Sequence, residues 1–309
     1  AGFIGSNIVK GLNRRGVSDI VVVDDLTDGK KFANLVGCDI ADYLDKDDFR
    51  ARIRNGSSFG GVTAVFHQGA CAVTTEWNGR YMMDNNYEYS KELLAYCNRN
   101  GAPFIYASSA AIYGIDREAR DDSGAERPVN VYGYSKWLFD QYVTSAAPQL
   151  SVQVVGLRYF NVYGPGEAHK GSMASVVWHA HKQIAQTGEV KLFAGSHGYG
   201  DGEQRRDFVH VADVVAVNLW FLDHPEARGI FNVGTGRSRS FNDLARAVIA
   251  WHGRGEIRYI PFPDHLKDSY QSFTEARLDR LRSAGCDLEF RELEDGVALY
   301  LDRIERANL

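Results

Sequence analysis

The sequence contains few residues of the kinds that build disulfide-linked, zinc-binding or fibrous proteins. Its 309 residues include only four cysteines and seven prolines. The cysteines are scattered and form no Cys-x-x-Cys pair: Cys38, Cys71, Cys97 and Cys286. This spacing predicts neither a disulfide framework nor a zinc site, so we expect no metal and a protein of the reducing cytoplasm. No Gly-x-Ser-x-Gly motif indicates a serine hydrolase.

The chain also lacks a basic character and a long apolar run. Its formal net charge is −5, so we expect no electrostatic recruitment of nucleic acid or anionic lipid. No apolar run reaches the roughly 18 residues that a membrane-spanning helix needs, and the first residues do not resemble a secretory signal. The hydrophobic fraction of 44% is ordinary for a globular protein and excludes a disordered or collagen-like chain.

Apolar β-branched runs alternate with helical patterns along the chain. Predicted strands lie at 20–25, 62–67, 104–109, 152–158 and 229–233, and predicted helices at 1–13, 82–98 and 132–144. The strand patterns are continuous rather than alternating, which is typical of strands buried on both faces. This order of elements predicts an α/β protein with a Rossmann-type, doubly wound parallel sheet.

The character of the sequence changes at Gly164-Pro165-Gly166, where the alternation stops. A helix near 173–187, a glycine-rich loop at 195–202 and irregular segments follow. We therefore expect a dinucleotide-binding domain at 1–163, to which the chain returns near 207–233. The segments 164–206 and 234–309 are expected to form a smaller, mixed α/β substrate domain.

The first residues are typical of a dinucleotide-binding turn. Gly2, Phe3, Ile4 and Gly5 look like the second half of a Gly-x-x-Gly-x-x-Gly motif, in which glycines let the backbone approach a pyrophosphate at a helix N-terminus. Asp24 follows Gly5 by 19 residues, where a ribose-binding acid is expected. A strand and a first glycine should precede this motif, so we expect the natural chain to begin before Ala1.

The residues leave two interpretations of cofactor preference. An acid at the strand end accepts a hydrogen bond from the ribose 2′-hydroxyl of NAD and repels the 2′-phosphate of NADP. Three nearby lysines, Lys30, Lys31 and Lys46, could neutralise that phosphate, or they could be ordinary solvated surface charges.

A tyrosine and a lysine four residues apart form the candidate catalytic pair. Tyr132 and Lys136 share one face of a predicted helix, and an ammonium group beside a phenol is expected to lower the phenol pKa. Tyr87 and Lys91 have the same spacing, but only the helix of Tyr132 has, as the preceding element, a strand that ends in paired hydroxyls. We expect Ser109 to donate to a substrate oxygen beside Tyr132, and the other pair to be structural.

The next predicted strand also ends in polar residues, in the order Arg-Tyr-Phe-Asn-Val-Tyr-Gly-Pro. Ligands of open parallel sheets bind at the carboxyl ends of strands. Asn161 could therefore hold a sugar hydroxyl or a phosphate, and a turn cap is an equally reasonable role.

Together these motifs resemble extended short-chain dehydrogenases/reductases that act on nucleotide sugars. Three further segments, at 74–77, 81–87 and 169–175, are similar to those of the ADP-L-glycero-D-manno-heptose 6-epimerases in this family. The resemblance extends over nearly the whole chain. It implies that ADP-D-glycero-D-manno-heptose is epimerised at C6″ through a transient 6″-ketone with tightly bound NADP, and that the protein is a homo-oligomer, by resemblance a pentamer.

The resemblance also implies roles for individual residues. Those expected to contact the cofactor are Gly2, Phe3, Ile4, Gly5, Asp24, Asp25, Lys31, Lys46, Gln68, Gly69, Ala70, Cys71, Ala72, Asn85, Tyr132, Lys136, Val162 and Lys170. Those expected to bind substrate are Ser109, Asn161, Ser172, His179, Phe193, Ala194, Gly195, Ser196, Arg206 and Tyr270. The loop before Arg206 is longer than is usual in the family, which leaves the choice between Arg205 and Arg206 open.

Inversion at one carbon explains the role expected for Lys170. The nicotinamide is fixed, so the ketone must turn over before hydride returns to its other face, and its oxygen then points away from Tyr132. A second proton donor on the far side solves this problem, and the resemblance places Lys170 there. Without the resemblance Lys170 would be interpreted as an exposed loop lysine.

Two other functions compete with this one. A UDP-hexose 4-epimerase or a 4,6-dehydratase would share the fold, but Ala110-Ala111 stands where a dehydratase has an Asp-Glu pair. A non-catalytic NADP-binding sensor would keep the glycines and could dispense with Ser109, Tyr132 and Lys136, all of which are present.

Overall fold

The computed structural model describes residues 1–115, 124, 126–264 and 270–307. A parallel four-stranded sheet forms its centre, in the order β10 (Gly229–Val233), β5 (Val154–Tyr159), β4 (Phe104–Ser109) and β3 (Val65–His67). Strand β5 is buried along its full length, which explains its continuous apolar pattern. A second parallel pair joins β1 (Val21–Asp24) to β2 (Asp42–Asp45).

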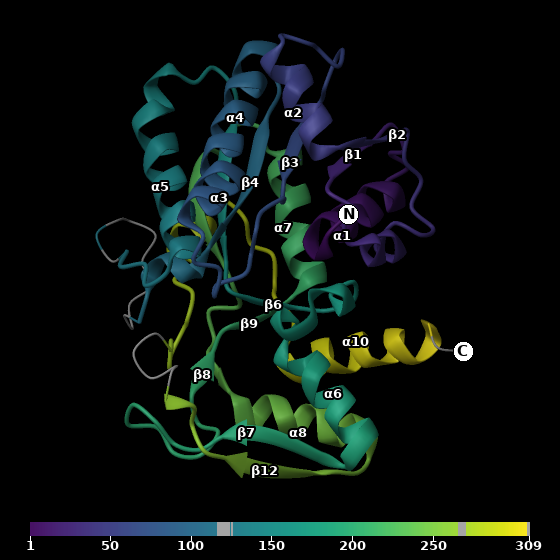
Figure 1. Cartoon of the computed structure of the whole chain (residues 1–309), viewed down its shortest axis with the longest axis vertical. Coiled ribbons are helices and arrows are strands. Elements are labelled where there is room, and N and C mark those ends of the chain that lie inside the picture. Colours follow the sequence, from purple (N-terminus) through teal and green to yellow (C-terminus); the bar gives the residue numbers. More distant parts are fainter. Residues whose placement is uncertain (116–123, 125, 265–269, 308–309) are drawn as a thin grey trace.

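Helices pack on both faces of the central sheet (Figure 1). On one face lie α2 (Lys46–Arg54), α3 (Gly79–Met83), α4 (Tyr89–Asn100) and α5 (Val131–Ala146), with the π-helical turn η2 (Asp84–Glu88) joining α3 to α4. On the other face α1 (Phe3–Arg14) packs against α7 (Val211–Asp223). Ile8 and Leu12 of α1 meet Val215 and Leu219 of α7 in a buried apolar contact.

A second group of elements lies below the central sheet in Figure 1. It contains the strand pairs β7 (Glu189–Phe193) with β12 (Glu256–Ile260) and β8 (Arg205–Arg206) with β11 (Arg239–Ser240), and the helices α6 (Val176–Thr187), α8 (Phe241–His252) and α10 (Leu293–Ala307). The pair β6 (Asn161–Tyr163) with β9 (Phe208–His210) connects the two groups. The remaining short elements are η1 (Gly29–Asn34), η3 (Ala110–Tyr113), η4 (Ala147–Gln149), η5 (Ala168–Met173) and α9 (Asp279–Ser283).

The predicted α/β fold with a Rossmann-type parallel sheet is confirmed. The single helix expected at 82–98 is instead interrupted by the π-helical turn, and β2, α2, β7 and β12 were not predicted. The three strands among them have only four or five residues each, and β2 and β12 have almost no buried positions, so apolar periodicity gives little signal for them. The domain boundaries stay a prediction. Among the described residues, no helix is long and apolar enough to cross a bilayer.

Candidate functional site

Helix α1 begins at Phe3, directly after the extended Gly2. A Cβ atom on Gly2 would meet no other atom within 4 Å, and the first turn of the helix carries no acidic residue. A helix N-terminus with open backbone in front of it suits a pyrophosphate. A Cβ on Gly5 would lie 3.8 Å from Cβ of Gln68, so the helix also borders the loop 68–72.

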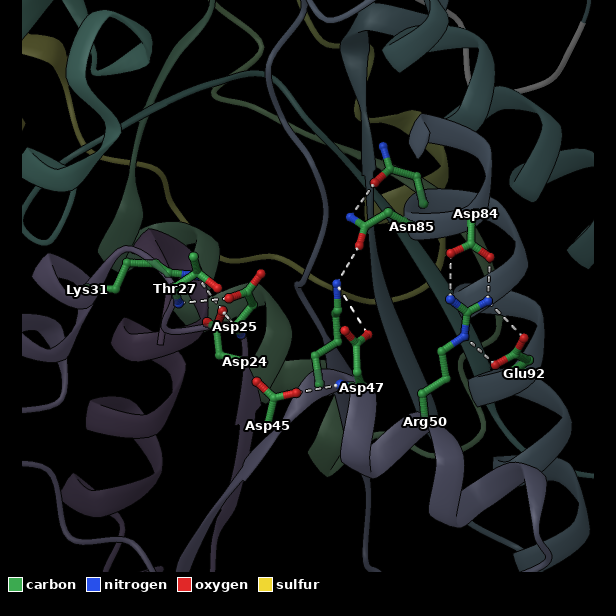
Figure 2. A network of polar contacts seen from close by, with 12 residues as sticks. Asp24, Asp25, Thr27, Lys31, Asp45, Asp47, Arg50, Asp84, Asn85 and Glu92 are labelled. Carbon is green, nitrogen blue, oxygen red and sulfur yellow. Dashed lines mark hydrogen bonds and ion pairs between the residues drawn. The ribbon is translucent and has the colours of Figure 1, made fainter. Parts of the chain in front are cut away.

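Asp24 ends β1 and faces this turn. Its carboxylate accepts hydrogen bonds from the Gly2 N–H at 3.0 Å and from Lys31 Nζ at 2.7 Å. A second lysine, Lys46 at the start of α2, donates from Nζ to Asn85 Oδ1 at 3.1 Å (Figure 2). Hydrogen bonds from Thr27 hold the pKa of Asp25 below its usual value. Acids suited to a ribose and lysines suited to a phosphate therefore lie next to each other.

The loop 68–72 is fastened at two points. Gln68 accepts from the Tyr159 hydroxyl at 3.0 Å and donates to Asn218 at 3.4 Å. Asn86, a buried residue of η2, accepts from the Cys71 N–H at 2.8 Å and donates to the Cys71 carbonyl at 3.0 Å. The Asn86 side chain also donates to Ser135 on α5, at 3.1 Å. Asn86 thus connects the loop to the helix that carries Tyr132.

Sequence analysis did not single out Asn86. The available signal was a pair of asparagines inside a helical pattern, where asparagine is an unfavourable residue. π-Helical turns of this kind frequently occur at functional sites.

The predicted catalytic groups meet at the end of β4. Asn130 caps the N-terminus of α5, and the first turn of that helix places Tyr132 in hydrogen-bonding reach of Ser109. The Ser109 hydroxyl accepts from the Ala111 N–H at 3.1 Å, which leaves its own proton free to donate. Ser109 and Tyr132, from segments far apart in the sequence, are therefore brought together.

The expected effect of Lys136 on Tyr132 is not what the structure shows. Burial raises the pKa of Tyr132, and the hydrogen bond with Ser109 only partly opposes this rise. Lys136 Nζ donates to the Ala107 carbonyl at 2.8 Å. Burial lowers the pKa of Lys136 to about 8, against the raising effect of Asp140. The prediction of a lowered phenol pKa is wrong here, because desolvation dominates at Tyr132 and the Lys136 ammonium group binds the Ala107 carbonyl instead.

The second Tyr-x-x-x-Lys pair has the local contacts expected of a structural pair. Lys91 forms an ion pair with Glu88 at 2.8 Å. Its ammonium group lies 4.4 Å from the centroid of the Tyr87 ring and 5.7 Å from that of Tyr142. These contacts hold Lys91 on the outer surface of the helix.

Lys170 lies on η5, and its ammonium nitrogen is 5.3 Å from the centroid of the Phe3 ring. Burial lowers the pKa of Lys170, while the charge of Glu167 acts in the opposite direction. Glu167 is buried and anchors the segment by accepting from the Ser175 N–H at 2.5 Å and the Ser175 hydroxyl at 2.7 Å. Lys170 is therefore a partly buried amine at the start of α1 rather than an exposed loop lysine.

A cavity of about 520 Å³ lies in the second group of elements, beside the connecting pair β6 and β9. Four of its described lining residues are basic, and none is Asp or Glu; the basic ones are Lys170, His179, Lys191 and Arg206. Asn161, Val162, Phe193 and Tyr270 also line it, as do Gln204 and Phe241, which the sequence did not suggest. Such a lining suits a ligand with more than one negative charge and an aromatic or sugar ring.

The two neighbouring arginines lie in different environments. Arg206 is buried, with its guanidinium 4.9 Å from the Tyr270 ring centroid and 5.7 Å from that of Phe241. Arg205 instead donates to the carbonyl and hydroxyl of Ser238, at 2.5 and 3.2 Å. Only Arg206 is in the cavity lining.

Several predicted site residues are not in the described lining of this cavity: Ser109, Tyr132, Lys136, Ser172, Ala194, Gly195 and Ser196. The Ala194 carbonyl and the Ser196 hydroxyl each accept from Gln204, at 3.1 Å, and Gln204 does line it. The segment 194–196 therefore lies directly behind the cavity wall.

The described residues contain no cluster of three or more potential metal ligands.

Comparison with known proteins connects this arrangement to one group of enzymes. An ADP-L-glycero-D-manno-heptose-6-epimerase of Alkalilimnicola ehrlichii is 60% identical over 307 residues, covering 99% of this chain and 96% of that protein. The crystal structure of the Helicobacter pylori ADP-L-glycero-D-manno-heptose-6-epimerase has a TM-score of 0.85 at 31% identity, over 98% of this chain and 93% of that one. The Thermus thermophilus UDP-glucose 4-epimerase in complex with NAD has a TM-score of 0.79 at 28% identity, over 99% and 97%.

The resemblance inferred from the motifs is thus confirmed at the level of both sequence and fold. The model of the NAD dependent epimerase/dehydratase family matches residues 1–234. This part of the chain contains the glycine turn, Ser109, Tyr132, Lys136 and Lys170. Together with the close relative, this match shows that the chain belongs to the NAD dependent epimerase/dehydratase family.

Proposed function

We propose that this protein converts ADP-D-glycero-D-manno-heptose to ADP-L-glycero-D-manno-heptose by inverting C6″. The observation that carries the proposal is the position of Lys170, which lines the cavity and also lies over Phe3 at the start of α1. One amine thereby borders both the predicted cofactor turn and the predicted sugar pocket. The relative at 60% identity supports the same substrate.

NADP is the proposed cofactor, and when bound it supplies reversible hydride exchange at C6″. Its pyrophosphate would be held by the start of α1 and its adenosine ribose by Asp24. Lys31 and Lys46 would hold the 2′-phosphate: Lys31 binds Asp24 at the end of β1, and the charge of Lys46 acts on the adjacent Asp25. Lys136 would contact the nicotinamide ribose.

The chain's own residues manage the proton on the C6″ oxygen. Tyr132, assisted by Ser109, takes or gives the proton on one side of the carbon, and Lys170 does so on the other. The lowered pKa of Lys170 favours this role, since a partly buried amine exchanges protons more readily near neutral pH. The transient ketone turns over between the two half-reactions, within a cavity large enough for a sugar to reorient.

Arg206 and Lys191 would hold the diphosphate, because they are cations of a cavity whose described lining has no carboxylate. Asn161 and His179 would bind sugar hydroxyls. Homo-oligomeric assembly, by resemblance a pentamer, is part of the proposal, and sedimentation equilibrium of the purified protein tests it.

The direct test of function is to incubate the purified protein with ADP-D-glycero-D-manno-heptose and follow the C6″ epimer by proton NMR. Appearance of the L-glycero epimer supports the proposal. UDP-glucose serves as the competing substrate, and formation of UDP-galactose without heptose epimerisation would assign a 4-epimerase instead. NADP binding without either reaction would favour a sensor. The nucleotide released from the denatured protein shows whether a 2′-phosphate is present.

A further inference from the structure

A buried carboxylate lies one helical turn beyond Lys136. Asp140 is fully buried on α5 and accepts three hydrogen bonds, each at 2.9 Å: from the Tyr106 hydroxyl, the Ser108 hydroxyl and Arg158 Nε. All three partners are donors to it. Arg158 can only donate, and its charge together with the two hydroxyl donors favours the ionised carboxylate, against the effect of burial, which raises the pKa of Asp140.

The two hydroxyl donors come from β4 and lie on either side of Ala107 in the strand. The carbonyl of Ala107 is the group that receives Lys136 Nζ, at 2.8 Å. Helix α5 is therefore tied to one three-residue stretch of β4 twice, through Asp140 and through Lys136. Ser109 is the next residue of this strand, so the same contacts set the position of Ser109 relative to Tyr132.

The charges around Asp140 balance only if Lys136 is counted. Arg158 forms ion pairs with both Asp140 at 2.9 Å and Glu126 at 3.0 Å, which leaves one carboxylate in excess. Lys136, only 4% exposed, supplies the second cation. Among the described residues, two titratable groups interact electrostatically with Lys136: Asp140 on the same helix and His67 on β3. Burial lowers the pKa of His67 to about 3, so His67 carries no charge near neutral pH.

We propose that Asp140 is the positioning residue for Lys136: its carboxylate clamps β4 against α5 and supplies the negative charge that keeps Lys136 an ammonium ion during the reaction. This inference rests on the proposed epimerase function for its kinetic readout. Asp140 has no direct contact with substrate in this scheme. It acts through Lys136, and through the strand that carries Ser109.

The Asp140→Asn variant tests the charge. Asparagine keeps an acceptor for the donors and leaves Arg158 paired with Glu126, so this substitution avoids stranding a cation. With the negative charge removed, Lys136 loses its proton at lower pH, and the alkaline limb of the kcat–pH profile is expected to move down by about one pH unit. KM for the nucleotide sugar should change little, because Asp140 is outside the cavity lining.

Glu92→Gln is the matched control. Glu92 is also a carboxylate that accepts from arginine: it accepts from Arg50 Nε at 2.7 Å (Figure 2) and from Arg54 Nη2 at 2.6 Å, and these residues lie on α2 and α4. Removing this charge should cost stability without moving the alkaline limb. An equal shift in both variants, or no shift in Asp140→Asn, would overturn the proposal.

The double variant Tyr106→Phe, Ser108→Ala tests the clamp separately. It removes both hydroxyl donors and keeps the charge, so kcat should fall while the alkaline limb stays in place. This variant also tests the proposal if Asp140→Asn does not fold, and an unchanged kcat would refute the clamp.

NMR titration of Lys136 gives a readout that does not need turnover. In protein labelled with carbon-13 at lysine Cε, the Lys136 signal should titrate at lower pH in Asp140→Asn than in the unaltered protein. If the unaltered protein does not epimerise the heptose, the proposed function fails and this titration still decides the role of Asp140. Identical Lys136 titrations in the two proteins would contradict that role.

Discussion

The ammonium nitrogen of Lys170 lies 5.3 Å from the centroid of the Phe3 ring, although 166 positions separate the two residues. This contact places η5 over the first turn of α1. A residue that sequence alone would leave on the surface is thereby brought to the predicted cofactor turn. The same residue lines the cavity that contains Arg206, His179 and Tyr270.

Removing the proposed proton carriers should stop epimerisation without unfolding the protein. We expect Tyr132→Phe and Lys170→Met each to lower kcat by about 10²- to 10⁴-fold, since each removes one general acid–base group. The double variant should show no turnover while NADP still binds. Epimer formation is measured by NMR and NADP binding by calorimetry.

Tyr134→Phe is the control for this pair of substitutions, because Tyr134 is 43% exposed on the same helix. Its kcat should match that of the unaltered protein. Continued epimerisation by the double variant would rule out the two-residue scheme.

Neutralising the buried arginine should weaken substrate binding more than neutralising its neighbour. We expect Arg206→Met to raise KM for the ADP-sugar by roughly 10- to 100-fold, the effect of losing charge-assisted hydrogen bonds to a phosphate. Arg205→Met should lower the free energy of unfolding, because Arg205 binds the backbone and hydroxyl of Ser238, and should leave KM nearly unchanged. Steady-state kinetics and urea unfolding separate the two effects. The reverse pattern would move the phosphate site to Arg205.

The lysines near Asp24 should distinguish the two dinucleotides. Lys31→Ala is expected to weaken NADP binding about tenfold more than NAD binding, because only NADP carries the 2′-phosphate. Lys30→Ala provides the comparison, since Lys30 is an exposed neighbour that lies on the same short helix. Equal losses for both dinucleotides in Lys31→Ala would show that this lysine does not read the 2′-phosphate.

A buried histidine should make the protein lose stability in acid. Burial lowers the pKa of His67 to about 3, against 6.5 for an exposed histidine. Below pH 6.5 the unfolded chain therefore binds a proton that the folded protein does not. The contribution is fully present above pH 6.5 and is lost toward pH 3, at up to about 1.4 kcal/mol per pH unit.

Urea unfolding at pH 7 and pH 5 measures this effect. His67→Gln should reduce the loss of stability between the two pH values, because glutamine does not titrate. His224→Gln, a change at a partly exposed histidine stacked on Trp220, should leave the loss unchanged. A His67→Gln variant with the same pH dependence as the unaltered protein would exclude His67 as the cause.

The sequence alone was enough to determine the class of fold and to nominate most of the candidate catalytic groups. Continuous apolar runs predicted the buried parallel strands β4 and β5, since residues of such runs face helices on both sides. Spacing along one helix identified Tyr132 with Lys136, and the hydroxyl-ended strand identified Ser109. The fold prediction is confirmed, and the catalytic residues stay a prediction; both depend on local backbone geometry, which neighbouring residues determine.

Only the tertiary structure decided which of these groups meet, and in what environment. Adjacent arginines cannot be told apart by composition, yet Arg206 enters the cavity and Arg205 turns to Ser238. The pKa of Tyr132 follows burial rather than the lysine four residues away. Asn86 and Asp140 gained their roles from partners on other elements. Burial and long-range partners depend on how distant segments pack, and periodicity along the chain carries no information about that.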